Sequence, residues 1–369
     1  MNVVIVSSSG QCGVYECAQI LLDGFSAAGH RVRYIGVKHW DDADLFRRLE
    51  QIAPDDEVVI FEYEPGIFHL RALVRAIAHL RFVRRKKVLL SVHEIEPSKY
   101  PAYHHIQWRL NQPARFRGPL EVVRLLGATA DLGLQYSSMR LFLDLLGWLP
   151  HLIVVHSQKV NDNIGLILAD RRKVVEIPLA VKALEGEKSA LRTRLGLPCD
   201  RFIFISPGFL FRRKRLIEVI QQMPANAELL IVGVTSEFDP GYLEEIQAYL
   251  TANPNPAVHL IPDYNVEPYV VASDAVILFY RDIFQSAVAG LAVGAGKPGI
   301  FSDLPGFAEF REAGLFVKTP QELHQAMLDI QDPVIYARYQ AGAQSARDAL
   351  SPRQIAQQHV QAINRHLKP

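Results

Sequence analysis

The chain has 369 residues, of which 49% are hydrophobic and 21% charged, a composition typical of a soluble globular enzyme and not of a disordered or fibrous protein. Its 40 Lys and Arg residues nearly balance 39 Asp and Glu residues, so the bulk charge argues against a nucleic-acid-binding protein. Three scattered cysteines exclude a disulfide framework and a zinc site with paired ligands, and favour a reducing compartment. The length exceeds that of a single hydrophobic core, so we expect two domains.

No signal peptide or membrane-spanning segment is expected. Residues 1–6 begin directly with a buried-strand pattern and lack the basic region that precedes the apolar part of a signal peptide. The most apolar later stretch, 139–150, contains Arg140 and Asp144 and is shorter than the ~18 residues that a spanning helix needs. We therefore predict a cytoplasmic protein, with peripheral contact with the inner face of the membrane as one option.

Short apolar runs alternate with amphipathic helical segments from the first residue, which is the pattern of parallel βαβ units. One helix is predicted at Val14–Ala28 and closed by Gly29, and another at Ile67–Phe82, where apolar residues recur at helical spacing. The strands of this first series are predicted at Val3–Ser7, Arg31–Val37, Glu57–Phe61, Lys87–Val92, His151–Val155 and Val174–Ile177.

A second series of strands follows a polar stretch. We predict a Rossmann-like N-terminal domain over residues 1–180, a linker at 181–198 and a Rossmann-like C-terminal domain over 199–350. A C-terminal helix at 351–369 follows, and packing back on the first domain is one option for it. Because ligands of open α/β sheets bind beyond the carboxyl ends of the strands, we expect an α/β fold of two doubly wound parallel sheets that face each other across a cleft. The second-series strands are predicted at Phe202–Ser206, Glu228–Val232, Ala257–Ile261, Ala275–Phe279 and Gly299–Ser302.

The segment from His93 to Gly133 interrupts the alternation, because it holds no convincing strand. Aromatic and basic side chains mix between Trp108 and Arg124. Two interpretations stay open, a long surface loop with solvated arginines or a patch that binds an acceptor or a membrane surface.

The first predicted strand runs through a glycine-bearing turn, Ser7-Ser-Ser-Gly10-Gln-Cys-Gly13, directly into a helix. Such a turn lets the backbone approach a phosphate at the helix N-terminus, although glycines also occur there for purely steric reasons. The turn departs from G-x-G-x-x-G, and Val37-Lys-His39 stands where a ribose-binding acid would end the second strand. Both departures argue against a nicotinamide dehydrogenase.

Four consecutive cations, Arg212 to Arg215, follow Ser206-Pro-Gly208 at the start of a predicted helix. The helix dipole adds to their mutual repulsion, so a bound diphosphate is a better explanation than an exposed basic helix end. The strand that ends near Tyr280 leads into Gln285-Ser286-Ala287 and another helix, whose start offers amide groups to a second part of the ligand. Tight packing of that small-residue helix on the sheet is the alternative.

These motifs together resemble the retaining GT-B glycosyltransferases of the GT4 family, group 1, over nearly the whole chain. Gly10 to Val14 is similar to the glycine-rich first turn of the family. Further similarities are Phe61-Glu-Tyr-Glu-Pro-Gly66-Ile-Phe68 to the E-Y-G-I-F element of one subgroup, Ser91-Val-His93-Glu94 to T-x-H, Val155-His156-Ser157 to V-x-H-S, Gly208 to Lys214 to G-x-x-x-x-x-K, and Ala289 to Pro298 to A-x-x-x-G-K-P.

The resemblance implies a nucleotide diphosphate-sugar donor bound mainly by the second domain, with Lys214 on the diphosphate and His93 near the transferred sugar. Phe209 stands where the family usually has Arg, so Arg212 or Arg213 is expected to replace it. We therefore take His93, Lys214 and Arg212 as candidate catalytic residues. The candidate substrate-binding residues are Gly10, Gly13, Glu94, Gly208, Arg213, Tyr280, Gln285, Ser286 and Ala287.

The acidic pair of the family's E-x7-E element is missing, because Ile283 and Leu291 occupy its positions. This places the resemblance with a subgroup in which a serine-led loop, here Ser286-Ala287, binds the donor. We expect a retaining, hexosyltransferase-type enzyme that needs no metal and no cofactor and transfers a sugar to a saccharide or a lipid-linked acceptor in bacterial surface polysaccharide or glycolipid synthesis. A nucleotide-sugar epimerase and a catalytically silent scaffold are the alternatives, and the donor's base and sugar stay open.

Overall fold

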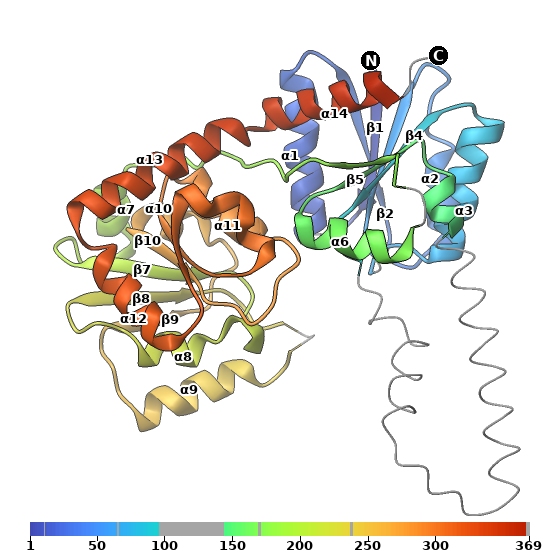
Figure 1. Ribbon diagram of the computed structural model, residues 1–369. Helices are drawn as coiled ribbons and strands as arrows, with labels where there is room; N and C mark the ends of the chain where they lie inside the picture. The colour runs from blue at the N-terminus through green and yellow to red at the C-terminus, as the bar shows by residue number, and fades with distance from the viewer. Residues whose placement is uncertain (11, 65, 96–143, 169–170, 237–238, 367–369) are drawn as a thin grey trace, which may run out of the picture. The chain divides into compact units, whose positions relative to one another are not determined.

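The computed structural model describes residues 1–369 except 11, 65, 96–143, 169–170, 237–238 and 367–369. The chain forms two compact units, which are described separately (Figure 1). Unit 1 comprises Met1–Ile177 and Gln357–Pro369, and unit 2 comprises Pro178–Ala356. The aromatic and basic patch predicted between Trp108 and Arg124 lies outside the described residues.

Unit 1 is built on a six-stranded parallel sheet in the order β2-β1-β3-β4-β5-β6. Each of these strands overlaps a strand predicted from the sequence. The predicted helix at Ile67–Phe82 begins later, at Leu70, and its last turn is a π-helix, η1 (His79–Val83). The strands are β1 (Asn2–Ser8), β2 (Arg31–Val37), β3 (Val58–Tyr63), β4 (Lys87–Val92), β5 (Leu152–Val155) and β6 (Val174–Glu176).

Helices cover both faces of this sheet (Figure 1). The chain moves from β1 to β2 in one direction and then crosses back to β3, so right-handed connections put α1 on one face and α2, α3 and α6 on the other. The C-terminal helix α14 contacts α1, where the rings of Phe25 and His359 lie 6.0 Å apart. The helices are α1 (Gly13–Ala27), α2 (Asp42–Leu49), α3 (Leu70–Ala78), α6 (Gln158–Ile167) and α14 (Pro352–His366).

Unit 2 holds a second six-stranded parallel sheet, in the order β12-β11-β10-β7-β8-β9. Its core packs the buried faces of these strands against helices, with Phe204, Ile231 and Ile277 fully buried. The strand order reverses between β7 and β10, which makes the carboxyl ends of these two strands the expected place for a ligand. The strands are β7 (Phe202–Pro207), β8 (Ala227–Val232), β9 (Val258–Ile261), β10 (Ala275–Leu278), β11 (Gly299–Ser302) and β12 (Gly314–Val317).

The edge strand β12 and the helix α2 are among the elements that were not predicted from the sequence. β12 is an edge strand of four residues in which Leu315 and Phe316 are only half-buried. The remaining helical segments of unit 2 are α7 (Lys188–Leu195), η3 (Arg212–Lys214), α8 (Leu216–Gln221), α9 (Tyr242–Ala252), α10 (Glu267–Ala272), α11 (Ala287–Gly294), η4 (Pro305–Ala313), α12 (Pro320–Asp329) and α13 (Pro333–Ala349).

The segment 181–198, which its polarity marked as a linker, belongs to unit 2 and contains α7. Two of its cations, Lys188 and Arg192, are paired with an acid inside the unit. Arg192 is 4% exposed and donates to Asp274 Oδ2 at 2.6 Å and to the carbonyl of Ala272 at 2.8 Å. Lys188 Nζ reaches the other carboxylate oxygen of Asp274 at 2.9 Å. The polarity of this segment suggested a linker because the acid that pairs with these cations lies some eighty residues later in the chain.

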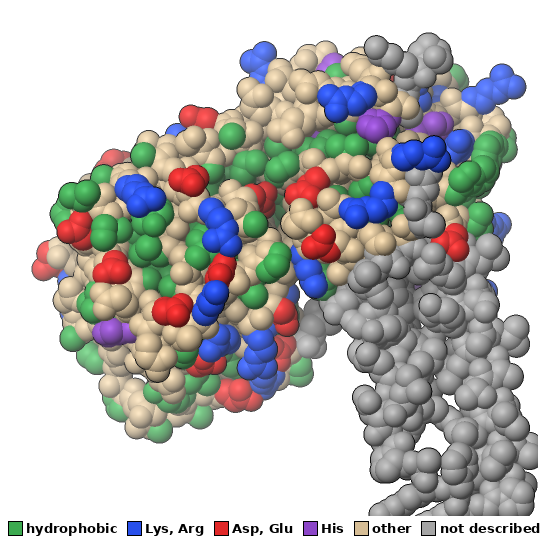
Figure 2. Space-filling view, in the orientation of Figure 1, with side chains coloured by type: hydrophobic (Ala, Val, Ile, Leu, Met, Phe, Trp, Pro, Cys, Tyr) green, Lys and Arg blue, Asp and Glu red, His purple; other side chains and the backbone are tan. Residues whose placement is uncertain are grey.

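Acidic and basic side chains are interspersed on the visible face of unit 2, as the near-zero net charge suggests (Figure 2). Among the described residues, no helix combines the length and the apolar character that crossing a bilayer requires.

Loss of the Asp274 carboxylate is expected to destabilise unit 2. In Asp274→Asn the buried guanidinium of Arg192 loses its charged partner, which costs about 3 kcal/mol of unfolding free energy. Urea denaturation measures this change. Asp348→Asn is the control, because Asp348 is 79% exposed and its pair with Arg347 contributes little. Equal stabilities of the two variants would contradict the structural role of α7.

Candidate functional site

The carboxyl end of β7 forms a tight turn that only glycine permits. Gly208 has a φ of +90°, a left-handed conformation that side chains rarely adopt, and its amide donates to the carbonyl of Val232 at 2.8 Å. Gly233, directly after the neighbouring strand β8, lies so close that a Cβ there would be 2.2 Å from the carbonyl oxygen of Gly208. The two backbones therefore touch, and the turn is fixed at the edge of the sheet.

Lys214 returns from η3 to this turn and points its ammonium group at the strand end. Its Nζ donates to the carbonyl of Pro207 at 2.7 Å, and the residue is only 4% exposed. Burial, with a smaller contribution from the neighbouring charge of Arg213, lowers the pKa of Lys214 to about 7. An ammonium group has three donors, so Lys214 has capacity for an additional acceptor at this position.

Tyr280 and the start of α11 lie beside Lys214. The Lys214 Nζ is 5.8 Å from the centre of the Tyr280 ring, and the Tyr280 hydroxyl is buried without a hydrogen-bond partner among the described residues. Burial raises the pKa of Tyr280, so its hydroxyl stays protonated and able to donate. A Cβ on Gly208 would lie 3.3 Å from Lys214 Nζ and 3.5 Å from Val288 Cγ2, which places the first turn of α11 against the same glycine.

Ser286 caps α11 by accepting a hydrogen bond from the amide of Ala289 at 3.1 Å. The earlier amides of the first turn, at Ala287 and Val288, have no partner within the helix and add the positive end of its dipole. Gln285 immediately precedes the cap and is half-buried, whereas Ala287 is exposed. Lys214, Tyr280 and the start of α11 thus present donors and positive charge to one place, which suits an anion.

The four consecutive cations do not act as one cluster. Arg212 pairs with Asp239 and Glu245, and its backbone amide also donates to Asp239 at 2.6 Å. Arg215 pairs with Glu218, and its guanidinium lies 3.9 Å from the centre of the Phe279 ring. Arg212 was expected to act on the donor. Its guanidinium is instead paired with two acids from the segment 239–245. These acids follow Arg212 by some thirty residues, beyond the reach of a local sequence motif.

Arg213 differs from its neighbours. Its guanidinium lies 5.0 Å from the centre of the Phe211 ring, and no ion pair with an acid is found for it among the described residues. Its charge acts on both Lys214 and Tyr280. Phe209, in the position where an arginine was expected, is 39% exposed and its ring lies 6.0 Å from that of Tyr264. Among the described residues, the positive charge of the turn that is not paired with an acid therefore comes from Lys214 and Arg213.

The carboxyl edge of unit 1 carries a different kind of chemistry. Parallel pairing places Glu62 of β3 beside Ser91 of β4, and Ser91 beside Val154 of β5. Side chains alternate between faces along a strand, so His93 shares the face of Ser91 and His156 shares that of Val154. The register thus brings four polar side chains, Glu62, Ser91, His93 and His156, to one face of the sheet.

These four side chains form a buried hydrogen-bonded network, and each is at most 4% exposed. Glu62 Oε2 accepts from Ser91 Oγ at 2.7 Å and is also hydrogen-bonded to His93 Nε2. Ser91 Oγ lies 2.7 Å from His156 Nε2, and His156 Nδ1 donates to the carbonyl of Ile177 at 2.8 Å. His93, a candidate catalytic residue, is therefore held by a buried acid that sequence reasoning had not selected.

Burial and charge act in opposite directions in this network. Burial raises the pKa of the Glu62 carboxyl, but hydrogen bonding and charge from His93 outweigh it, and the pKa falls below its usual range. Burial, and after it the charge of His93, lowers the pKa of His156 to about 3. By residue type Glu62, His93 and His156 could also bind a metal, since their ligating atoms lie within 4.8 Å of one another. Those atoms are hydrogen-bonded to each other, directly or through Ser91. We therefore interpret the cluster as a proton network.

The glycine turn after β1 has space around it. A Cβ on Gly10 would make only an ordinary contact, 3.7 Å from Ser8 Oγ, and one on Gly13 would meet nothing within 4 Å. Neither glycine has a positive φ. The steric explanation for these glycines therefore has no support among the described residues of unit 1, and a close approach by a ligand stays a prediction. Glu94 follows His93 and is half-buried.

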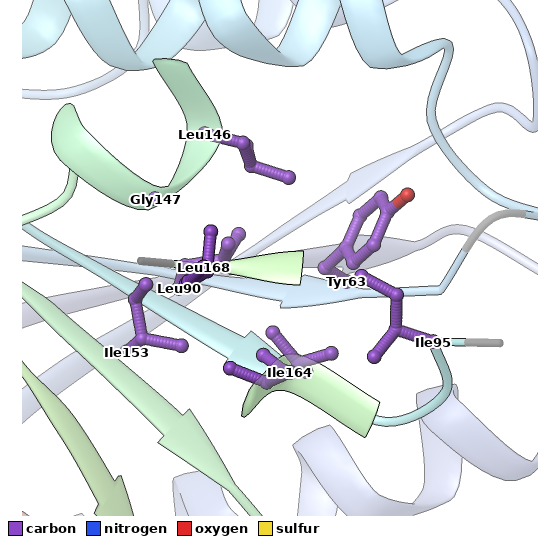
Figure 3. Close-up of a pocket in the computed structure, with 9 residues that line it drawn as sticks. Tyr63, Leu90, Ile95, Leu146, Gly147, Ile153, Ile164 and Leu168 are labelled. Atoms are coloured by element: carbon purple, nitrogen blue, oxygen red, sulfur yellow. The ribbon is translucent and has the colours of Figure 1, made fainter. Parts of the chain in front are cut away.

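An apolar pocket lies on the other face of the same sheet (Figure 3). Tyr63, Leu90 and Ile153 come from β3, β4 and β5, and Leu146 and Ile164 of α6 line the pocket from helical segments. Because its lining is apolar, this pocket offers no acid, base or charge. The polar chemistry of unit 1 lies on the face covered by α1.

Glu62 and Ser91 are the main residues whose roles the sequence did not indicate. The signal that could have found Glu62 is the pairing of predicted strands, because acids rarely occupy a fully buried strand interior. That pairing needs the register between β3 and β4, which a single sequence does not provide.

Lys214 is expected to lower the stability of unit 2. Its pKa of about 7 in the folded chain lies below the unfolded value of 10.5, so the unfolded state binds more protons between these pH values. Stability therefore rises with pH from about 7 to 10.5 through this residue. Lys214→Met should be more stable than the natural chain by about 2 kcal/mol at pH 6.5, and the difference should shrink by pH 9.5. Urea denaturation at both pH values measures it, and a variant that is less stable at both would contradict the charge burial.

No protein-family model matches the chain, and no curated protein matches it. Solved structures do match it along nearly its whole length. HepE of Anabaena, in complex with UDP-glucose, has 16% sequence identity and a TM-score of 0.73, covering 99% of this chain and 100% of that one. Sucrose-phosphate synthase of Thermosynechococcus elongatus has 17% identity and a TM-score of 0.62, covering 99% and 98%. WaaG, a glycosyltransferase involved in lipopolysaccharide biosynthesis, has 14% identity and a TM-score of 0.59, covering 98% of each chain. At these identities the similarity establishes the fold, and the chain has the two Rossmann-like α/β units of the GT-B glycosyltransferase fold.

Proposed function

We propose that the protein is a glycosyltransferase that transfers a sugar from a nucleotide diphosphate-sugar to a saccharide or lipid-linked acceptor, with retention of configuration. The observation that carries the proposal is the donor set at the end of β7. Lys214 Nζ, the neighbouring Tyr280 ring and the first turn of α11 lie together at the carboxyl end of β7, where the strand order of unit 2 reverses. A pyrophosphate matches this set in charge and in acceptor number.

Two further observations support the proposal. HepE, whose fold is similar, was solved with UDP, with UDP-glucose, and with UDP and glucose. The GT4 resemblance also assigns Lys214 to the diphosphate and His93 to the transferred sugar. We place the reaction in the cytoplasm, in bacterial surface polysaccharide or glycolipid synthesis.

The residues fit a mechanism based on stabilising the leaving group. The bond between the anomeric carbon and the diphosphate oxygen breaks, and the acceptor oxygen forms the new bond on the same face. The acceptor proton passes to the departing phosphate. Negative charge grows on the diphosphate, where Lys214, Arg213 and the α11 amides stabilise it by about 3 kcal/mol or more. In this proposal the cationic side chains supply the charge that a divalent metal would otherwise provide.

Loss of the Lys214 ammonium is expected to weaken donor binding. Lys214→Ala removes a charge-assisted hydrogen bond worth about 1.5–3 kcal/mol, so the Kd for UDP-glucose should rise roughly 10- to 100-fold. Isothermal titration calorimetry measures the Kd, and transfer of labelled sugar measures turnover.

Arg201→Met is the matched control. Arg201 belongs to the same unit but precedes β7, at the opposite end of the strand, where it pairs with Glu228 at 3.1 Å. The Arg201→Met variant should bind UDP-glucose with the same Kd as the natural chain. Unchanged binding in Lys214→Ala would refute the diphosphate site. Normal donor binding by the natural chain with a rearranged nucleotide-sugar as product would instead indicate an epimerase.

Donor binding is also expected to take up a proton. A bound pyrophosphate raises the pKa of Lys214 from about 7, so a neutral Lys214 becomes protonated when the donor binds above that pH. UDP-glucose affinity should therefore be constant near pH 6 and fall as pH rises to 8.5, by up to about tenfold per pH unit. Calorimetry in buffers of different ionisation enthalpy counts the protons. Lys214→Arg stays charged and should lose this dependence; the same dependence in that variant would assign the proton elsewhere.

A further inference from the structure

The buried network of unit 1 contains an unexplained carboxyl group. Glu62 lies in the middle of the sheet and is 2% exposed. Its Oε2 is hydrogen-bonded to both Ser91 and His93, whereas its Oε1 is buried without a partner among the described residues. A buried acid costs stability. We therefore expect one where it performs a task that an apolar side chain could not.

The hydrogen bonds of the network require one more proton than its separate groups supply. His156 Nδ1 faces the carbonyl of Ile177, which only accepts, so this nitrogen carries a proton. An ionised Glu62 beside a neutral His156 would then leave the single hydroxyl proton of Ser91 to serve two acceptors, each at 2.7 Å. One of these contacts would be repulsive. An additional proton, shared along Glu62, Ser91 and His156, satisfies both of them. The pKa values of Glu62 and of His156 are each lowered when the groups are taken singly, but coupled groups bind a proton as a set, and the hydrogen-bond geometry of this set requires one.

The position of the proton on His93 does not depend on how that extra proton is shared. Glu62 Oε2 accepts from His93 Nε2 whether the additional proton lies nearer to Glu62 or to His156. Whenever the His93 ring carries a single proton, that proton is therefore fixed on Nε2 and the lone pair lies on Nδ1. The amide of His93 donates to the carbonyl of Tyr63 at 3.0 Å, so the backbone is held by the same strand that carries Glu62.

We propose that Glu62 is a positioning residue for His93, and that Ser91 and His156 hold the Glu62 carboxyl in place by sharing one additional proton with it. Glu62 touches no substrate and acts only through the orientation and tautomer of the His93 ring. Its importance for sugar transfer rests on the proposed function, whereas its effect on the ring is a property of the folded unit.

The ring tautomer is measured directly by NMR of the full chain labelled with ¹⁵N-histidine. The resonances are assigned by comparison with His93→Gln and His156→Gln. In the natural chain, His93 should show a protonated Nε2 and an unprotonated Nδ1. In Glu62→Leu the acceptor is lost, and the resonances should move to a mixture of both tautomers. A proton on Nδ1 of His93 in the natural chain, or unchanged His93 resonances in Glu62→Leu, would overturn the proposal.

Two further variants keep the test valid if Glu62→Leu fails to fold. Glu62→Gln keeps an oxygen that accepts from Nε2, so it should largely preserve the His93 tautomer. Ser91→Ala removes the link to His156 without touching His93. It should leave His156 Nε2 unprotonated, whereas the natural chain should show this nitrogen partly protonated. A His156 Nε2 resonance that is the same in Ser91→Ala and in the natural chain would refute the shared proton.

Kinetics separate positioning from a purely structural role. Glu62→Leu should lower kcat by roughly 10- to 100-fold, the usual effect of removing a group that orients a functional histidine, and should change the donor KM less than about twofold. Glu62→Gln should restore most of kcat. Glu57→Gln is the control, because Glu57 is exposed just before the same strand and should leave both constants unchanged. An unchanged kcat in Glu62→Leu, with the NMR result as expected, would refute the role in transfer but not the proton network.

Discussion

The contact between the Lys214 ammonium and the last carbonyl of β7 is the interaction on which the candidate site of unit 2 depends. Parallel strands send their carboxyl ends to one edge, and the reversal of order between β7 and β10 opens a place there for a ligand. The left-handed Gly208 lets the chain leave that edge and return through η3, which brings the cation back to the strand it came from. A buried cation without an acid beside it is costly, and an incoming anion removes that cost. The site is therefore built at the expense of stability, as functional sites commonly are.

The carboxyl edges of the two sheets gather different kinds of side chain. In unit 2 the edge gathers positive charge, because the nearby acids Asp239 and Glu245 neutralise Arg212 but not Lys214. In unit 1 the edge gathers groups that exchange protons, with Glu62 and His93 buried side by side. A leaving group that gains negative charge and a sugar that gains positive charge need these two environments. In the proposed glycosyl transfer, unit 2 stabilises the leaving group and unit 1 supplies the oriented histidine.

Most of the fold could be predicted from the sequence, because buried parallel strands are continuous apolar runs separated by helix-length segments. β12 is an edge strand that is only partly buried, and 181–198 was assigned to a linker because the pairing of Lys188 and Arg192 with Asp274 crosses many residues of chain. The site was accessible only in part. Lys214 and His93 stand at strand ends that the pattern locates. The neutralisation of Arg212 and the link between Glu62 and His93 depend on tertiary contacts and strand register, which no local motif encodes.

The most direct test of the diphosphate site is a crystal structure of the protein with UDP bound. Pyrophosphate oxygens should lie within hydrogen-bonding distance of Lys214 Nζ and the Tyr280 hydroxyl, with the first amides of α11 pointing at the same group. A pyrophosphate bound away from the carboxyl ends of β7 and β10, with Tyr280 still unpartnered, would contradict the site and with it the proposed glycosyltransferase function.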